Sequence, residues 1–386
     1  MTTLEQVAEI TGGGTPPRAE ASYFGGGICW ATPTDVTALQ DLYIQETKET
    51  LTPAGLAGSS ARLLPAGAVL LTSRATIGFT AVSKVPISTN QGFVNFVCGP
   101  RLQPEYLAYW LRAKKPTLER LANGATFKEI SRGTVRKLEI NVPDRTEQAR
   151  VVDLLTRAEN IVRMRREAEQ KAKEIIPALF LDMFGDPARN QKGWVLARLS
   201  ECTYFQEGPG ILAKDFRDSG VPLLRLAGLR SGRANLDGCN FLDEEMVRKK
   251  WSHFRVSRGD LLVSTSATFG LPAVVGPDAE GAIPYTGIIK FRPLDDRVEP
   301  TYLRAYLGSR WFLEQAKAQA AGAVIKHFGP THLRNMLMPL PPKALQEELA
   351  RKFLASEALV RKSLDTKLLA IKAFQSLLAS MFGEAA

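Results

Sequence analysis

The sequence is poor in the residues that carry most enzyme chemistry. Its 386 residues include three histidines and four cysteines, and no two cysteines form a CxxC pair. Without such clusters, neither a zinc site nor a disulfide framework is indicated. His327 and His332 stand five residues apart, a spacing that does not place them on one face of a helix. The histidines are therefore interpreted as surface or structural residues.

Nucleotide-binding and catalytic motifs are also missing. The chain has no GxGxxG fingerprint and no GxSxG elbow, and the triple glycine Gly12–Gly14 lacks the Lys-Ser/Thr ending of a phosphate-binding loop. A nuclease-like acidic pattern, Asp35 with Glu46-Thr47-Lys48, has no counterpart in the second half. We expect no metal and no cofactor in this chain, and a binding protein rather than an enzyme.

Long apolar runs are absent as well. The longest candidate, Ile175–Phe184, is interrupted by Asp182, and the start of the chain does not read as a signal peptide. We therefore expect a cytoplasmic protein. What the chain does have is positive charge: a net charge of +10 favours a polyanionic partner, and nucleic acid is favoured over membrane.

The chain is a sequence written twice. Gly67–Gly78 (GAVLLTSRATIG) matches Gly259–Gly270 (GDLLVSTSATFG) at an offset of 192. The offset is 196 for Pro104-Glu-Tyr-Leu against Pro300-Thr-Tyr-Leu, and 198 for Met183-Phe-Gly against Met381-Phe-Gly. Because the offset changes so little, both halves are expected to share one α/β (α+β) fold.

Each half ends in a long amphipathic segment. From Asp144 to Phe184, apolar residues return at steps of mostly three and four, and Leu345–Phe382 repeats the pattern. Such periodicity predicts two coiled-coil-like helices, each roughly 60 Å long at about 1.5 Å per residue. The expected division is a domain at 1–143, a helix at 144–185, a second domain at 186–341 and a second helix at 342–386.

Local patterns place the remaining elements of the first half. Thr3–Gln6 has capping-box spacing and predicts a short helix through Ile10. Gly67–Val82 predicts a strand with its hairpin partner, and Gly92–Val97 predicts another strand. Pro104–Leu121, rich in Tyr and Trp, predicts a helix with a core face; Pro300–Ala321 is its expected counterpart.

The predicted loops contain residue types that read DNA. Arg and Lys contact guanine, Asn and Gln contact adenine, and all of these types can contact phosphates. The candidates in the first half are Arg18, Arg74, Asn90, Gln91, Lys128 and Arg132. Those in the second half are Lys214, Arg217, Arg225, Arg230, Arg233, Tyr285, Lys326 and His327. Asn90-Gln91 faces Tyr285-Thr286 in the alignment, so the two halves should read different short sequences.

Taken together, these features resemble the specificity (S) subunit of type I restriction–modification enzymes. The resemblance rests on the two glycine-flanked segments, on Asn90-Gln91-Gly92, on the entry Val142-Pro143 to Glu147-Gln148 and on the helix ending Ala178–Asp186. It implies two target recognition domains separated by two long antiparallel helices in a pseudo-two-fold arrangement, and a bipartite, asymmetric DNA target. It also implies two methyltransferase (M) subunits, which bind S-adenosylmethionine, and restriction/translocase (R) subunits, which use ATP and Mg²⁺.

Two alternatives remain open at this point. A paired-helix scaffold for protein assembly would carry its basic charge incidentally. A self-sufficient nuclease would need a catalytic site that the sequence does not display.

Overall fold

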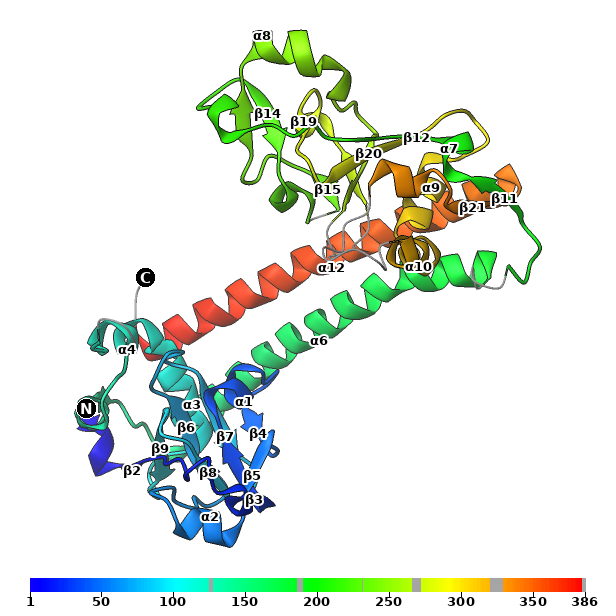
Figure 1. Ribbon diagram of the computed structural model, residues 1–386. Coiled ribbons are helices and arrows are strands. Elements are labelled where there is room, and N and C mark those ends of the chain that lie inside the picture. The colour runs from blue at the N-terminus through cyan, green and yellow to red at the C-terminus, as the bar shows by residue number, and fades with distance from the viewer. Residues whose placement is uncertain (125–127, 186–189, 231, 266–271, 320–328, 384–386) are drawn as a thin grey trace. The chain divides into compact units, whose positions relative to one another are not determined.

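The computed structural model describes residues 1–124, 128–185, 190–230, 232–265, 272–319 and 329–383 (Figure 1). The chain divides into two compact units, Met1–Ala168 with Leu364–Ala386, and Glu169–Ser363. The division falls within both long helices, so each unit contains one globular domain and a segment of each helix.

A five-stranded sheet forms the centre of the first unit. Its strand order is β2-β9-β6-β7-β4, with β4 parallel to β7 and the other neighbours antiparallel. A three-stranded sheet of order β5-β3-β8 and the pair β1-β10 complete the unit. The bounds are β1 Thr2–Thr3, β2 Ala8–Gly12, β3 Phe24–Ala31, β4 Tyr43–Ile44, β5 Glu49–Leu51, β6 Val69–Thr72, β7 Thr80–Ser83, β8 Ile87–Thr89, β9 Phe93–Cys98 and β10 Glu139–Ile140.

Helix α3 (Pro104–Ala113) covers this sheet, and α4 (Lys115–Leu121) follows it. The predicted core face is confirmed, since Tyr106, Tyr109 and Trp110 are all buried. The single predicted helix is divided in two. Pro116 is the second residue of α4, a position near a helix start that tolerates proline. Short helices α1 (Pro33–Thr37), α2 (Pro53–Ala57) and α5 (Arg132–Arg136) lie in the connections.

One local prediction for the first half is wrong. The helix expected from Thr3 through Ile10 is only the 3-10 turn Leu4–Gln6, and Ala8–Gly12 is strand β2. The capping contact exists, with Gln6 Oε1 accepting the Thr3 N–H at 3.0 Å. Pairing of β2 along β9 then prevails over the local helical signal, because it buries Ala8 and Ile10 in the core.

The second unit repeats the sheet order of the first. Its five-stranded sheet runs β12-β20-β17-β18-β15, with β15 parallel to β18, beside a four-stranded sheet β13-β16-β14-β19 and a pair β11-β21. The bounds are β11 Val195–Arg198, β12 Thr203–Glu207, β13 Phe216–Arg217, β14 Val221–Leu224, β15 Arg233–Ala234, β16 Asn240–Leu242, β17 Leu261–Ser264, β18 Ala273–Val275, β19 Ile283–Pro284, β20 Ile288–Pro293 and β21 Leu337–Leu340.

The helices of the second unit follow the same plan. The predicted helix from Pro300 is again two helices, α9 (Pro300–Leu307) and α10 (Arg310–Gln319); the expected end at residues 320–321 lies outside the described residues. Shorter helices are α7 (Leu199–Cys202), α8 (Glu244–Met246) and α11 (Pro330–Leu333).

Both long helices are present: α6 spans Arg145–Phe184, where the periodicity predicts Asp144–Phe184, and α12 spans Lys343–Phe382, where it predicts Leu345–Phe382. Asp144 caps the start of α6, because its Oδ1 accepts the Glu147 N–H at 2.8 Å. In the first unit, Val151 and Leu155 of α6 share a buried cluster with Phe374 and Leu378 of α12.

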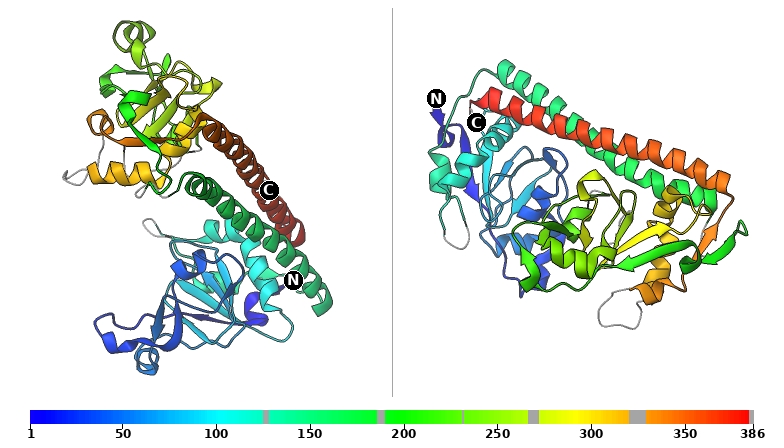
Figure 2. Two further views of the ribbon diagram at one scale, coloured as in Figure 1. Left: turned by 90° about the vertical axis from the view of Figure 1, so that its right-hand side faces the viewer. Right: turned by 90° about the horizontal axis from the view of Figure 1, so that it is seen from above.

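In the second unit, Ile176 and Phe180 of α6 share a buried cluster with Leu349 and Phe353 of α12. Within each unit the two helix segments therefore lie side by side, as both figures show (Figures 1 and 2). Burying a Leu or Phe side chain contributes about 1.5–3 kcal/mol, so these clusters fix each domain to its helix segments.

Candidate nucleic-acid interface

Three strand ends of the first unit meet at one edge of its domain. The Ser73 N–H after β6 donates to the Gly92 carbonyl at 2.8 Å, and the Gly14 N–H after β2 donates to the Thr89 carbonyl at 2.9 Å. These bonds bring Arg74, Asn90 and Gln91 to the same place. We call this group, with Lys128 and Arg132, the first loop edge.

Glycine is required where β2 ends. A Cβ built on Gly13 would lie 1.9 Å from the Asn90 carbonyl oxygen, so only a glycine allows the two backbones to approach this closely. A Cβ on Gly14 would lie 2.3 Å from the Ala61 nitrogen. The triple glycine therefore packs the Asn90-Gln91 turn against the end of β2.

Lys128 and Arg132 reach the edge through backbone pairing. The Ala75 N–H donates to the Lys128 carbonyl at 3.3 Å, and the Ile130 N–H donates to the Ser73 carbonyl at 2.9 Å. Arg132, the first residue of α5, places its guanidinium beside Gly12. Five of the six first-half candidates thus come together although up to 58 residues separate them in sequence.

Arg18, the sixth candidate, lies against the neighbouring three-stranded sheet. Its Nη1 contacts both carboxylate oxygens of Glu49, at 2.8 and 3.0 Å, and its guanidinium carbon lies 5.0 Å from the ring centroids of Phe24 and Trp30. The Trp30 indole N–H donates to the Gly14 carbonyl at 3.1 Å, which connects this sheet to the first loop edge. Sequence reasoning missed Trp30, because no repeated motif marks it.

The polar groups of the first loop edge remain accessible. Arg74 pairs with Glu129 at 3.1 Å, and both side chains are almost half exposed. Exposed ion pairs contribute little, so a phosphate can replace such a partner at low cost. Gln91 is exposed and its Oε1 accepts from the Thr15 hydroxyl, while Asn90 Oδ1 accepts the Gly92 N–H at 2.9 Å. Both amide side chains therefore have N–H groups to donate.

The second unit repeats the Ser73–Gly92 contact at the corresponding edge, whereas Pro209, which stands at the position of Gly14, has no N–H to donate. The Thr265 N–H donates to the Gly287 carbonyl at 2.9 Å, and the Gly208 N–H donates to the Ile288 carbonyl at 2.9 Å. A Cβ on Gly208 would lie 2.0 Å from the Pro284 carbonyl oxygen, so Gly208 plays the role of Gly13.

The side chains at this second loop edge are different. Tyr285 stands where the first unit has Asn90, with the Arg225 guanidinium 4.2 Å from its ring centroid. Phe216 meets the same ring edge-on, with 6.5 Å between centroids. An arginine held over an aromatic ring by this contact can still donate its N–H groups to a base or a phosphate. We define the second loop edge as Phe216, Arg225, Tyr285 and Thr286.

The remaining candidates of the second half are scattered. Lys214 and Arg217 are exposed and flank Phe216, with Arg217 Nη1 donating to the Lys214 carbonyl at 3.2 Å. Arg230 is exposed at the end of a 3-10 turn. Arg233 lies on β15, away from Tyr285. Lys326 and His327 lie outside the described residues.

No cluster of three or more His, Cys, Asp or Glu side chains that could hold a metal occurs among the described residues. In the same part of the chain, no helix combines the length and the apolar character that crossing a membrane requires. Burial raises the pKa of the Cys98 thiol to about 12 and that of the Cys202 thiol to about 11, so neither is a ready nucleophile.

The chain is similar in sequence to DNA specificity proteins of type I restriction systems. Residues 1–174 match the model of the type I restriction modification DNA specificity domain. Over 366 residues the chain is 24% identical to the type I restriction enzyme MjaIX specificity subunit of Methanocaldococcus jannaschii, covering 89% of this chain and 83% of that protein. The EcoKI specificity subunit of Escherichia coli is 22% identical over 42% of this chain and 35% of its own length.

Solved structures agree on the fold. A structure from work on complex assembly and conformational transition of the type I R-M system covers 99% of this chain and 96% of its own, with a TM-score of 0.66 and 19% identity. The S subunit from M. genitalium covers 100% of this chain and 96% of its own, with a TM-score of 0.54 and 12% identity. The resemblance to type I restriction–modification specificity subunits seen in the sequence is thus confirmed.

Proposed function

We propose that this chain is the DNA sequence-specificity subunit of a type I restriction–modification complex. It recognises an asymmetric, bipartite DNA target and positions methyltransferase and restriction subunits on it. The observation that carries this proposal is the pair of loop edges: two domains of one strand order each pack a glycine closely against the corresponding turn and present different side chains on it.

The two edges suit different bases. Gln91 and Asn90 are amide side chains of the type that pairs with adenine, with Arg74, Lys128 and Arg132 available for phosphates or guanine. Arg225, held on Tyr285, is of the type that pairs with guanine O6 and N7. The net charge of +10 supports binding to a polyanion. Each domain would then read its own half of the target.

The proposed architecture follows the boundaries expected from the sequence. Recognition domains at 1–143 and 186–341 alternate with helices at 144–185 and 342–386, which would pair antiparallel in a pseudo-two-fold arrangement. The shared clusters of α6 and α12 within each unit support this pairing. The helices would set the distance between half-sites, where one turn of DNA is about 34 Å.

The chemistry would reside in the partners. Two M subunits would bind S-adenosylmethionine and methylate adenine, and R subunits would use ATP and Mg²⁺. The chain itself would be non-catalytic and would act in the cytoplasm, with the DNA.

The test changes helix length. The chain and its M partner are expressed in cells, and methylated adenines are mapped by sequencing. Inserting about seven residues, two turns, into both α6 and α12 should lengthen the gap between the two half-sites and leave the half-sites themselves unchanged. An unchanged gap would contradict the ruler role. Absence of any bipartite motif, with the complex assembled, would favour the protein-assembly scaffold.

A further inference from the structure

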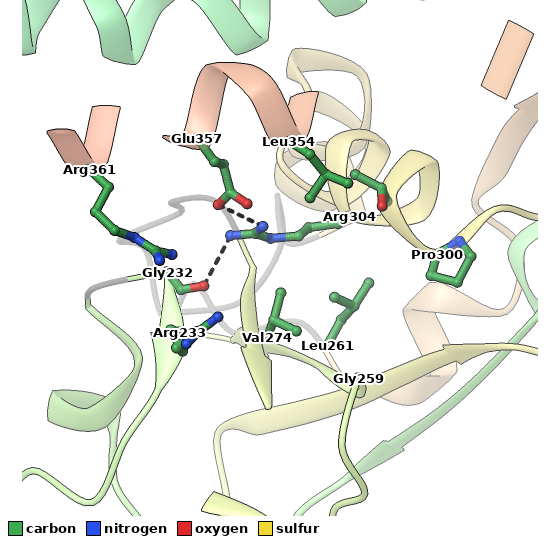
Figure 3. Close-up of a pocket in the computed structure, with 11 residues that line it drawn as sticks. Gly232, Arg233, Gly259, Leu261, Val274, Pro300, Arg304, Leu354, Glu357 and Arg361 are labelled. Carbon is green, nitrogen blue, oxygen red and sulfur yellow. Dashed lines mark hydrogen bonds and ion pairs between the residues drawn. The ribbon is translucent and has the colours of Figure 1, made fainter. Parts of the chain in front are cut away.

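The second unit contains a pocket of about 270 Å³ between the start of β17, helix α9 and helix α12 (Figure 3). Gly259, Leu261 and Val274 form its floor, and Pro300 and Leu354 form its apolar side. This volume lies just below the range of about 300–1,000 Å³ typical of small-molecule sites. It suits a compact ligand.

Three arginines and one glutamate line the pocket, so the formal charge of its lining is +2. Arg304, with 6% of its side chain exposed, pairs with Glu357 at 2.7 Å and donates to the carbonyls of Gly232 and Pro272 at 3.0 Å each. Arg233 from β15 and Arg361 from α12 lie on the same side of the pocket, next to Gly232 (Figure 3). Arg361 makes no ion pair within the described residues.

The first unit shows how the pocket arises. The Val82 N–H donates to the Leu42 carbonyl at 2.8 Å, and the Val274 N–H donates to the Gly232 carbonyl at 3.1 Å, so Leu42 and Gly232 are equivalent. Leu42 is buried, and its side chain is missing at Gly232. Tyr109, whose hydroxyl donates to Glu159 at 2.8 Å, stands at the position of Ala305. Leu42 and Tyr109 are therefore replaced by small residues, of which only Gly232 lines the pocket, while Arg304, which also lines it, stands at the position of Ala108.

Charge changes together with size. Tyr43 and Arg233 occupy equivalent positions, since Tyr43 pairs with Val82 and Arg233 pairs with Val274. An arginine therefore replaces a tyrosine. Glu105, which accepts from the Tyr43 hydroxyl at 3.3 Å, is replaced by Thr301. At this place the second unit has thus gained Arg233 and Arg304, lost a carboxylate and lost the Leu42 side chain. This combination favours an anionic ligand.

The pocket is separate from the second loop edge. Leu261 in the pocket is the first residue of β17 and pairs with Val274, whereas Ser264 at the other end of β17 pairs with Ile288 next to the Tyr285 turn. Three residues along a strand span about 10 Å. A ligand here would not compete for the base-reading side chains.

We propose that this pocket binds a small phosphate monoester. The ligand's charge of about −2 above its second pKa near 6 matches the lining charge of +2. Arginine forks bind phosphate oxygens in bidentate geometry, which places the phosphate on Arg361, on the side of the pocket next to Gly232. The ester group lies on Leu261 and Val274. This site goes beyond DNA recognition, and its existence does not depend on that function.

The test is calorimetric titration of the full chain with phenyl phosphate, inorganic phosphate, benzoate and dimethyl phosphate at pH 8. Phenyl phosphate should bind with one site and more tightly than the other three. Arg361→Gln should weaken it about tenfold, as loss of a charged hydrogen bond predicts. Thr301→Glu, which restores the carboxylate of the first unit, should abolish binding. A glutamate at the second position of α9 suits the helix dipole, so the fold should persist.

Arg163→Gln, the equivalent change in the first half, is the matched control and should leave the affinity unchanged. Thermal unfolding of each variant establishes that it is folded. The proposal is overturned if phenyl phosphate shows no binding at millimolar concentration, if Thr301→Glu binds as wild type, or if Arg163→Gln weakens binding as much as Arg361→Gln. Equal affinity for dimethyl phosphate would identify a phosphodiester site and overturn the monoester assignment.

Discussion

In both units a glutamine of the long helix makes the same hydrogen bonds to the domain, whereas the side chains at the first and second loop edges differ. In the first unit Gln148 Oε1 accepts the Gln103 N–H at 2.8 Å, and its Nε2 donates to the carbonyls of Arg101 and Pro143 at 2.8 Å each. Gln346 makes the equivalent contacts in the second unit, with Glu299, Arg297 and Pro341, at 2.9–3.0 Å. Both halves of the repeat therefore keep a glutamine side chain that attaches the domain to its long helix.

An ion pair between the domain and the long helix also occurs in both units, but its arginine comes from a different position. Glu159 and Glu357 stand at the repeat offset of 198, and each pairs with an arginine from the preceding domain, Arg112 or Arg304. The two arginines lie one helical turn apart when the helices α3 and α9 are aligned on their tyrosines. The glutamate of the ion pair is therefore kept on the long helix, whereas its arginine partner comes from one turn of α3 and from a different turn of α9.

The largest expected effect tests whether both loop edges need a glycine for close approach. Gly13→Ala and Gly208→Ala would each place a Cβ about 2 Å from a carbonyl oxygen, and should each lower the free energy of unfolding by about 3 kcal/mol. Chemical denaturation of the full chain measures this. Gly27→Ala and Gly210→Ala, with no atom within 4 Å of the new Cβ, are the matched controls and should stay within about 0.5 kcal/mol of wild type. Tolerance of alanine at position 13 or 208 would contradict the shared turn.

The next effect tests the equivalence of the two helix anchors. Gln148→Leu and Gln346→Leu each leave two carbonyls and one N–H without their partner at a buried site, so each should cost about 2–3 kcal/mol of unfolding free energy. Because the contacts match, the two costs should agree within about 0.5 kcal/mol. Gln375→Leu, at an exposed position of α12, should be neutral. Clearly unequal costs would show that the two anchors are not equivalent.

Much of this organisation could be predicted from the sequence, because it repeats. The constant offset between matched segments predicts two copies of one domain, and the apolar periodicity predicts both long helices. The contact of Gly13 with Asn90 could not be read locally, since 77 residues separate them. The repeat contained a usable signal, however: Gly208 and Tyr285 stand at the same separation of 77.

Other features gave no such signal. Apart from β8 and β19, the strands of the second sheet of each unit lie in residues 20–60 and 211–250, where the two halves do not align by motif. No motif therefore marks Trp30 or Phe216, and nothing in the sequence shows that Arg225 lies on Tyr285 while Arg233 lies on β15 and lines the pocket. Which residue faces which edge depends on strand pairing over long distances, and composition does not encode it.

A third effect separates the two edges by function. Gln91→Ala should weaken DNA binding by about 1–3 kcal/mol and relax the base preference of one half-site only. Arg225→Ala should do the same at the other half-site. Methylation mapping with the M partner, together with binding measured at fixed salt, reads out both. Arg120→Ala, an exposed arginine on α4, controls for loss of charge and should preserve both half-sites. If either variant relaxed both half-sites equally, the assignment of one edge to one half-site would be wrong.

The smallest effect concerns a core position at which the units differ in charge. Asn95 pairs with Thr11 across the first sheet, and Lys290 pairs with Gln206 at the same place in the second. Lys290 is buried, and its Nζ donates to the carbonyls of residues 253, 254 and 255 at 3.1–3.4 Å. Burial lowers the pKa of Lys290, nearby Arg292 lowers it further, and Asp260 opposes them. Between this lowered pKa and the unfolded value near 10.4, the unfolded chain binds more protons than the folded one.

The contribution of Lys290 to stability must therefore rise with pH across that window. Lys290→Met removes the titrating group, so the unfolding free energy of wild type minus that of the variant should increase from neutral pH towards pH 10. Asn95→Met is the matched control: its difference from wild type should not depend on pH, because asparagine does not titrate. A flat wild-type-minus-Lys290→Met curve would mean that the ammonium group is as well solvated by its three carbonyls as by water. The two cores would then differ in shape alone, and the charge at position 290 would carry no electrostatic cost.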